Sequence, residues 1–222
     1  DAHIKNGSVA KPVCGFDIQI LDEEGNELPN HKEGFVVVKL PLPPGTLMGI
    51  WNNEERFFSG YLEQIDGFYF TGDGGYKDAD GYIYITGRVD DVINVAGHRL
   101  STAEMEEVIA SHNMVAECAV FGIHDEIKGQ TPLALVVTKA GNDVAESVIE
   151  QEVIAKIRSN IGTIATLKRV IVVDRLPKTR SGKILRKLLR DIADKKEYSI
   201  PSTIDDPEII NEIIQVYKQH KI

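Results

Sequence analysis

The chain has 222 residues, of which 42% are hydrophobic, enough for one large domain or two small ones with buried cores. Its 34 acidic and 25 basic side chains give a net charge of -9, which opposes a general nucleic-acid-binding role. No apolar run approaches the roughly 20 residues that cross a bilayer, and the first residues lack a signal-peptide pattern. We therefore expect a globular protein with no nucleic-acid and no membrane partner.

The cysteines and the first residues bear on the setting of the protein. Cys14 and Cys118 lie in apolar stretches and suggest neither a disulfide framework nor a thiolate zinc site, which favours a reducing compartment. The first residue is Asp1 rather than methionine, and the segment after it is typical of the middle of a sequence. We expect the chain to be a fragment of a longer protein.

The first part of the chain predicts a mostly β structure. Short extended segments separated by turns are expected at residues 17–21, 35–40, 68–70 and 82–86. Prolines and a glycine within residues 41–45 interrupt this pattern and predict a connecting loop.

Helices and strands alternate after Gly87. Ser101 as N-cap, with Glu104 three residues later, predicts a capped helix that runs to Ser111. Further strands are predicted at residues 116–121, 132–138 and 170–174, and further helices at residues 148–159, at 184–193 and near the C-terminus. The overall expectation is an α/β (α+β) fold, with a mostly β part followed by a small α/β part whose short central sheet is flanked by helices.

The charged segment 87–91, Gly-Arg-Val-Asp-Asp, lies where the two patterns meet. It predicts a domain boundary between residues 1–89 and 90–222. An arginine beside an aspartate can exchange partners when domains rotate, so a hinge and a passive linker both remain open.

A lysine loop at residues 177–183, Pro-Lys-Thr-Arg-Ser-Gly-Lys, is the most informative segment. Gly182 permits a tight turn, so the loop amides together with Arg180 and Lys183 predict an anion cradle, with a solvated cationic turn as the alternative. It is not a Walker loop, because Pro177 stands where that motif needs glycine and Ile184 where it needs serine or threonine.

A basic run surrounds this loop and predicts a local positive field within an acidic protein. Its members are Lys178, Arg180, Lys183, Arg186, Lys187 and Arg190. No aromatic residues are interleaved for base stacking, so the run does not indicate a nucleic-acid site.

Four other positions carry weaker signals. Asp73, in the glycine-rich segment 69–75, predicts an exposed carboxylate on a turn after a strand, suited either to sugar hydroxyls or to an ordinary Asx-turn. Residues 96–99, Ala-Gly-His-Arg, precede the capped helix and predict either a phosphate contact or a tight turn. His112 after that helix and Arg158 on a later helix indicate nothing specific by themselves, and no cysteine or carboxylate cluster supports a transition-metal site.

Four ordered segments together carry a resemblance. Residues 69–73, 85–91, 95–99 and 176–183 read Tyr-Phe-Thr-Gly-Asp, Ile-Thr-Gly-Arg-Val-Asp-Asp, Val-Ala-Gly-His-Arg and Leu-Pro-Lys-Thr-Arg-Ser-Gly-Lys. They resemble the adenylate-forming acyl-CoA synthetases over essentially the whole chain, and most of all the short-chain acetate and propionate CoA ligases. Segments 40–46, 94–102 and 115–120 are more similar to the propionyl-CoA synthetase branch than to the acetyl branch.

The resemblance implies an ATP-dependent reaction in two halves. A carboxylate attacks the α-phosphate of ATP to form acyl-AMP and pyrophosphate, and the CoA thiolate then displaces AMP. ATP with Mg²⁺ and CoA are substrates, and no prosthetic group is expected. Domain rotation separates the two half-reactions.

The resemblance also implies roles for single residues. Lys183 matches the lysine of the adenylation step. Asp73 matches the carboxylate that holds the ribose hydroxyls, Arg88 a nucleotide contact and Arg99 a contact to ATP phosphate. Asp90 matches the hinge.

A second set of implied roles concerns CoA and a metal ion. The CoA set is Ala96, Gly97, His98 and Arg158, with the first three at the pantetheine tunnel and Arg158 at the CoA nucleotide. Ala96 departs from the serine common in the acetyl branch, which puts a side-chain contact there in doubt. The metal set for a peripheral magnesium is Ala110 and Val115 through their carbonyls, together with His112.

The family's glycine-rich phosphate loop, adenine pocket and acyl pocket lie upstream and are absent from these 222 residues. The resemblance therefore implies a missing N-terminal catalytic domain and an inactive fragment. It also implies acylating and deacylating enzymes at Lys183, and a location in the cytoplasm or the mitochondrial matrix. A carrier-protein adenylation domain, another acyl-CoA ligase and a noncatalytic regulatory module are the alternatives.

Overall fold

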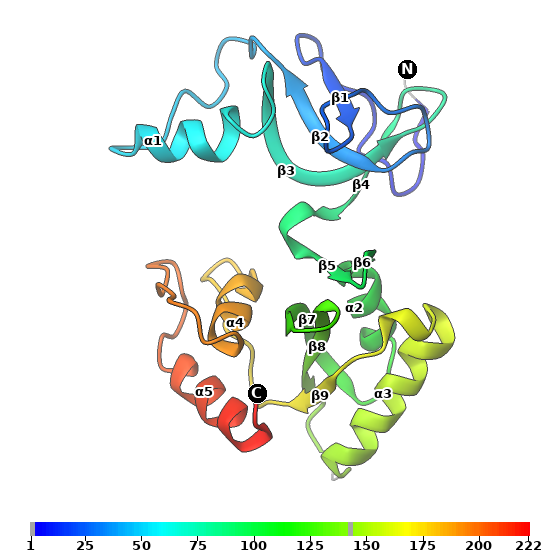
Figure 1. Cartoon of the computed structure of the whole chain (residues 1–222), viewed down its shortest axis with the longest axis vertical. Helices are drawn as coiled ribbons and strands as arrows, with labels where there is room; N and C mark the ends of the chain where they lie inside the picture. Colours follow the sequence, from blue (N-terminus) through cyan, green and yellow to red (C-terminus); the bar gives the residue numbers. More distant parts are fainter. Residues whose placement is uncertain (1–2, 142–143) are drawn as a thin grey trace. The chain divides into compact units, whose positions relative to one another are not determined.

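The structure, a computed structural model, describes residues 3–141 and 144–222 (Figure 1). It divides into two compact units, of which the first ends at Asp90 and the second begins at Asp91. This division falls inside the charged segment 87–91, where a short 3₁₀ helix spans Val89–Asp91. That the units act as domains joined by a hinge stays a prediction.

The first unit is an antiparallel sheet in the order β1-β2-β3-β4. Its strands are β1 (Ile18–Leu21), β2 (Gly34–Lys39), β3 (Phe68–Lys77) and β4 (Ile83–Arg88). The predicted mostly β character is confirmed. The long connection from β2 to β3 also contains a helix that the sequence analysis did not predict, α1 (Glu54–Phe57), which the Asn53 side chain caps by accepting a hydrogen bond from the Arg56 amide at 3.1 Å.

The glycine-rich segment predicted as a turn is part of β3, and this corrects the position of Asp73. Asp73 pairs with Val36 of β2 on one side and with Arg88 of β4 on the other. The register shifts at Thr71 and Gly72, because Val36 pairs with Asp73 whereas the next β2 residue pairs with Phe70. Pairing on both sides outweighs the local turn preference of a Gly-Asp-Gly sequence and leaves an irregular strand instead of a turn.

The second unit is a five-stranded sheet with two helices on each face, as Figure 1 shows. Its strands are β5 (Val92–Val95), β6 (His98–Ser101), β7 (Val115–Asp125), β8 (Gly129–Thr138) and β9 (Arg169–Val172). Its helices are α2 (Thr102–Ala110), α3 (Glu146–Asn160), α4 (Arg186–Ala193) and α5 (Ile209–His220). The expected α/β part with a central sheet flanked by helices is confirmed.

Strand β8 is the centre of this sheet. It pairs antiparallel with β7 and β5 and parallel with β9. Alternate residues of β7 and β8 point to opposite faces, so Phe121 and Leu135 pack against α4 and α5 whereas Val120 and Val136 pack against α2 and α3. Burial on both faces explains why these strands read as continuous apolar runs.

Two elements differ from the sequence expectation. Strands β5 and β6 were not predicted. Helix α4 begins at Arg186 rather than at residue 184, since Ile184 forms an antiparallel bridge with Lys178 and remains extended. Among the described residues, no helix is long and apolar enough to cross a membrane.

Candidate functional site

Asp73, Arg88 and Asp90 form one charged cluster in the first unit. The Arg88 Nη1 donates to the Thr71 carbonyl at 3.0 Å and lies 3.4 Å from Asp73 Oδ1. The Arg88 Nε donates to Asp90 Oδ1 at 3.0 Å. Burial lowers the pKa of Arg88, but the Asp90 and Asp73 carboxylates outweigh it and raise this pKa above its ordinary value. The structure thus brings together three residues that the sequence singled out.

The irregularity in β3 decides how the Asp73 carboxylate is presented. The Thr71 hydroxyl donates to the Val36 carbonyl at 2.6 Å and accepts from the Asp73 amide at 3.1 Å. The Asp73 side chain keeps 35% of its area exposed. A carboxylate has about four lone-pair sites. Among the described residues, its one hydrogen-bond contact is the 3.4 Å contact to Arg88, which leaves acceptor capacity for hydroxyl donors.

Gly72 allows the Arg88 guanidinium to lie against the backbone. Its φ is +77°, and a Cβ at this position would lie 2.5 Å from Arg88 Nη2 and 2.8 Å from Cζ. We expect Gly72→Ala to displace this guanidinium and to lower the free energy of unfolding by more than the about 1–3 kcal/mol typical of backbone strain alone. Urea unfolding measures the loss, and the NMR signal of the Arg88 Nε–H reports the displacement.

Gly67→Ala is the matched control for this variant. Gly67 has a φ of +79°, nearly that of Gly72, but a Cβ there would meet nothing within 4 Å. The control therefore carries the strain without the collision. Equal losses of stability in both variants, with an unchanged Arg88 signal, would contradict the prediction.

Lys183 lies at the end of a hairpin between β9 and α4. Lys178 and Ile184 bridge its base, and the Thr179 amide donates to the Lys183 carbonyl at 2.9 Å. Gly182 has a φ of +84°, a left-handed conformation that favours glycine. The Lys183 side chain is exposed and, within the described part of the chain, has no hydrogen-bond or ion-pair partner.

Three amides of the predicted cradle donate to protein groups instead. The Gly182 amide donates to the Thr179 carbonyl at 2.8 Å, and the Lys183 amide donates to the Thr179 hydroxyl at 3.1 Å. The Arg180 amide donates to the Thr203 carbonyl at 3.0 Å. Because these amides already donate hydrogen bonds that hold the hairpin, an anion that binds here must contact side chains rather than these amides.

Fewer residues contribute to the predicted positive field than the basic run contains. Lys178 Nζ lies 2.6 Å from Glu117 Oε2, and Arg186 Nη2 lies 2.6 Å from Glu106 Oε2. These carboxylates offset two of the charges. The exposed cations near the hairpin include Arg180, Lys183 and Lys187.

The segment 96–99 forms the tip of a hairpin, so the tight-turn alternative is confirmed, with β6 lying between this turn and the capped helix. Ala96 and Gly97 join β5 to β6 with φ of +49° and +83°, the signs of a type I′ turn. His98 and Arg99 lie on β6, and all four residues are exposed. The capped helix starts only at Thr102, after Ser101 accepts the Glu104 amide at 3.3 Å.

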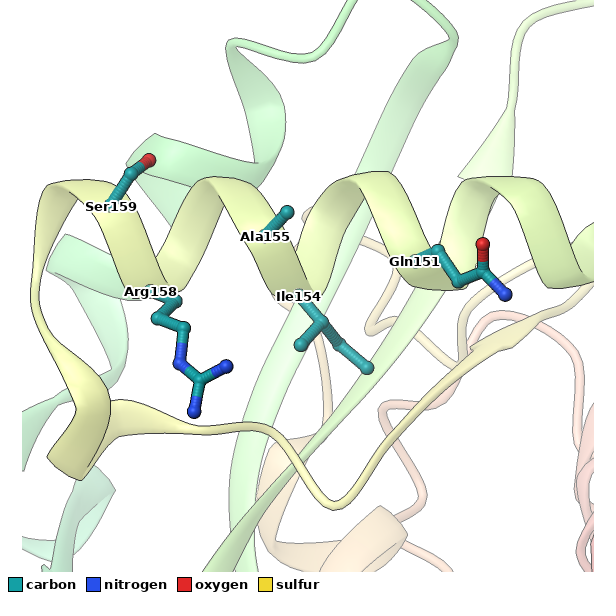
Figure 2. A pocket seen from close by; sticks show the side chains of 5 residues that line it. All are labelled: Gln151, Ile154, Ala155, Arg158 and Ser159. Atoms are coloured by element: carbon teal, nitrogen blue, oxygen red, sulfur yellow. The ribbon is translucent and has the colours of Figure 1, made fainter.

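Arg158 lies on α3, beside an open pocket of about 520 Å³. Figure 2 shows the residues that line it: Gln151, Ile154, Ala155, Arg158 and Ser159. Arg158 and Ile154 extend from the same side of the helix. Among the residues that the structure describes, nothing forms a hydrogen bond or ion pair with the Arg158 side chain.

Both ring nitrogens of His112 contact protein groups. Its Nε2 lies 3.0 Å from Glu152 Oε2, and its Nδ1 accepts the Met114 amide at 3.3 Å. Both ring nitrogens are thus engaged by protein groups, and a metal ion bound there must displace one of them. Within the described ranges, no group of three His, Cys, Asp or Glu side chains is arranged to hold a metal. The set of His112 with the Ala110 and Val115 carbonyls stays a prediction.

Comparison with known proteins places these features in a family. Residues 104–183 match the family model of the AMP-binding enzyme C-terminal domain, so the match ends at the hairpin lysine. This segment is an AMP-binding enzyme C-terminal domain. The chain is 46% identical over 213 residues to human acyl-CoA synthetase short-chain family member 3, mitochondrial, covering 96% of this chain and 31% of that protein.

Another relative and a solved structure support the same family. The acetyl-coenzyme A synthetase of Pyrobaculum arsenaticum is 41% identical over 218 residues, covering 98% of this chain and 32% of that protein. The crystal structure of ATP-bound MatB from Rhodopseudomonas palustris is 30% identical with a TM-score of 0.71, covering 85% of this chain and 36% of that one. The resemblance to the short-chain acyl-CoA synthetases is confirmed. The chain spans about a third of the length of the curated relatives it matches.

The sequence analysis did not identify four residues that hold the candidate site residues in place. Thr71 and Thr179 lie inside the quoted motifs, and a hydroxyl one to three residues before a glycine was a usable signal. Glu106 and Glu117 carry no such signal, because their basic partners are 80 and 61 positions away.

Proposed function

We propose that this chain is the C-terminal part of an AMP-forming short-chain acyl-CoA synthetase. The complete enzyme converts a short-chain carboxylate, ATP with Mg²⁺ and CoA into acyl-CoA, AMP and pyrophosphate through an acyl-adenylate. The names of the relatives, acyl-CoA synthetase and acetyl-coenzyme A synthetase, support this reaction class. The propionate-like segments noted above favour propionate or acetate as the carboxylate.

The observation that carries the proposal is the presentation of Lys183. Its ammonium is exposed, and a hydrogen-bonded hairpin holds its backbone while no described residue neutralises it. Negative charge builds up on the α-phosphate as a carboxylate approaches. A preorganised ammonium at that point stabilises the transition state more than the ground state. We assign the adenylation step to Lys183.

The cluster in the first unit supports a nucleotide role. Asp73 retains acceptor capacity for the ribose hydroxyls, and Arg88, held by Asp73, Asp90 and the Thr71 carbonyl, supplies a fixed cation beside it. Arg99 is assigned to an ATP phosphate. The ion pair between Arg88 and Asp90 can break when the units rotate, which supports Asp90 as the hinge.

The second unit supplies the groups assigned to CoA. The hairpin tip at Ala96, Gly97 and His98 has little side-chain bulk at its turn, and this supports a role at a narrow channel for pantetheine. Arg158 offers an unpartnered guanidinium, among the described residues, for the phosphates of the CoA nucleotide. We assign no step to the peripheral magnesium, because His112 is engaged elsewhere.

The same assignment suggests how the enzyme is regulated and where it acts. Acylation of Lys183 removes the charge on which adenylation depends, so acylating and deacylating enzymes switch the activity. Relatives named mitochondrial support the matrix as one location, with the cytoplasm as the other.

The test compares this chain with the complete polypeptide. We expect the 222 residues alone to release no acetate- or propionate-dependent pyrophosphate, because they lack the phosphate loop and acyl pocket. The complete polypeptide is expected to release pyrophosphate and form acyl-CoA with free CoA. Turnover by the chain alone would refute the fragment proposal, and a complete polypeptide that makes no acyl-AMP would refute the enzyme.

A further inference from the structure

Both legs of the lysine hairpin are tied to the same part of the sheet. On the first leg, Lys178 pairs with Glu117 of β7 at 2.6 Å. On the second leg, Arg186 donates from Nε and Nη2 to the two oxygens of Glu106 on α2, at 2.7 and 2.6 Å. This two-point contact fixes the orientation of the guanidinium as well as its distance. The hairpin thus has two anchored legs, and Lys183 lies between them.

Glu106 joins Arg186 to the edge of the sheet. Its Oε1 also accepts the Val120 amide at 2.8 Å, and Val120 belongs to β7, the last strand in the sheet order. The side chains of Arg186 and Glu106 are only 22% and 16% exposed. A partly buried, bidentate pair that also satisfies a strand amide is costly to disturb, so it resists movement.

Arg186 is close enough in sequence to control Lys183. Two residues separate them, Ile184 and Leu185, and both pack against the hydrophobic core under α4. Ile184 bridges to Lys178, and the Leu185 amide donates to the Pro177 carbonyl at 2.9 Å. Hydrogen bonds and packing hold both residues of this short connection, so we expect a shift of Arg186 to move the Lys183 backbone.

The Lys183 side chain has no partner of its own among the described residues, so its position depends on its backbone. We infer that Glu106 and Arg186 are positioning residues for adenylation, which hold the hairpin against β7 so that the Lys183 ammonium meets the α-phosphate. This inference rests on the proposed function. The pair acts through Lys183 and touches no substrate.

The test separates the two half-reactions in the complete polypeptide. Arg186→Met removes the guanidinium but keeps an unbranched aliphatic side chain. Glu106→Gln removes the negative charge but keeps an oxygen that can accept the Val120 amide. A misplacement of about 1 Å costs on the order of 10²-fold in rate, so we expect each variant to lower the kcat of carboxylate-dependent ATP–pyrophosphate exchange by about 10- to 100-fold. Thioester formation from supplied acyl-AMP does not use Lys183 and is expected to stay near the wild-type rate.

Two further variants distinguish positioning from a loss of stability. Arg186→Lys keeps the charge and is expected to restore part of the exchange rate. Val153→Ala removes buried volume from α3, in the core cluster on the opposite face of the sheet, and destabilises the unit without touching the hairpin. It is expected to show no selective loss of adenylation.

Three outcomes decide the inference. Selective loss of adenylation in Arg186→Met and Glu106→Gln supports it. Equal losses in both half-reactions, or an unchanged exchange rate, overturn it while the proposed function stands. A wild-type polypeptide that forms no acyl-AMP overturns the proposed function and this inference together.

Discussion

Lys183→Ala in the complete polypeptide is expected to lower the rate of acyl-AMP formation by about 10²–10³-fold, the usual cost of removing one preorganised donor from a transition state. Thioester formation from supplied acyl-AMP is expected to change little. The reason is that the ammonium acts where charge builds up on the α-phosphate as the carboxylate attacks it, and the proposed rotation between the half-reactions moves Lys183 away before the thiolate attacks the acyl carbon and AMP leaves. Pyrophosphate exchange and acyl-CoA formation, measured separately, give the two rates.

The control for this variant is Lys187→Ala. Lys187 is also an exposed lysine, four positions later and on α4, and it carries no assigned role. Its removal changes the local charge equally but leaves the hairpin end intact. Comparable losses in both variants would assign the effect to the local field rather than to Lys183, and equal losses in both half-reactions would contradict the adenylation role.

Asp73→Ala is expected to raise the KM for ATP by about 10²-fold or more. A hydrogen bond to a charged group contributes about 1.5–3 kcal/mol, and the proposed carboxylate accepts two such bonds from the ribose. Arg88 keeps the Asp90 carboxylate and the Thr71 carbonyl as partners, so we expect the guanidinium to remain in place. Initial rates against ATP concentration measure the effect, and AMP titration by calorimetry checks it independently.

Asp66→Ala and Asp73→Asn are the comparison variants. Asp66 is an exposed carboxylate of the same unit, and its loss changes the net charge equally. It is expected to leave the KM for ATP unchanged. Asparagine at position 73 keeps a neutral acceptor and is expected to give an intermediate KM. An unchanged KM in Asp73→Ala would remove Asp73 from the nucleotide site.

Local pattern predicted most elements because their signals are local. The continuous apolar runs of β7 and β8 and the capping pair Ser101 and Glu104 are each read within a few positions. Strands β5 and β6 were not predicted, because the motif at residues 94–99 was interpreted as a turn before a helix and the pairing of these strands with each other was not considered. Asp73 was wrongly placed on a turn, because glycine preferences are local whereas pairing with β2 and β4 is not.

For the candidate sites, too, local sequence signals predicted some features and missed others. The motifs singled out candidate site residues, including Lys183, Arg88 and Asp90, and their roles stay predictions. The motifs did not predict what surrounds these residues. The amides of Arg180, Gly182 and Lys183 donate to protein groups. Arg186 is paired with a glutamate 80 positions earlier, which only the packing of α2 and α4 along β7 brings near.

The sequence by itself indicated the family, most element types and the lysine proposed for adenylation, because these depend on short motifs and on apolar spacing. Tertiary structure alone decided how that lysine is held. The charge balance, amide use and anchoring of the hairpin come from Glu106, Glu117 and Thr203, whose separation in sequence hides them from any local pattern. A hydrogen bond or ion pair depends on distance in space, and only the folded chain defines that distance.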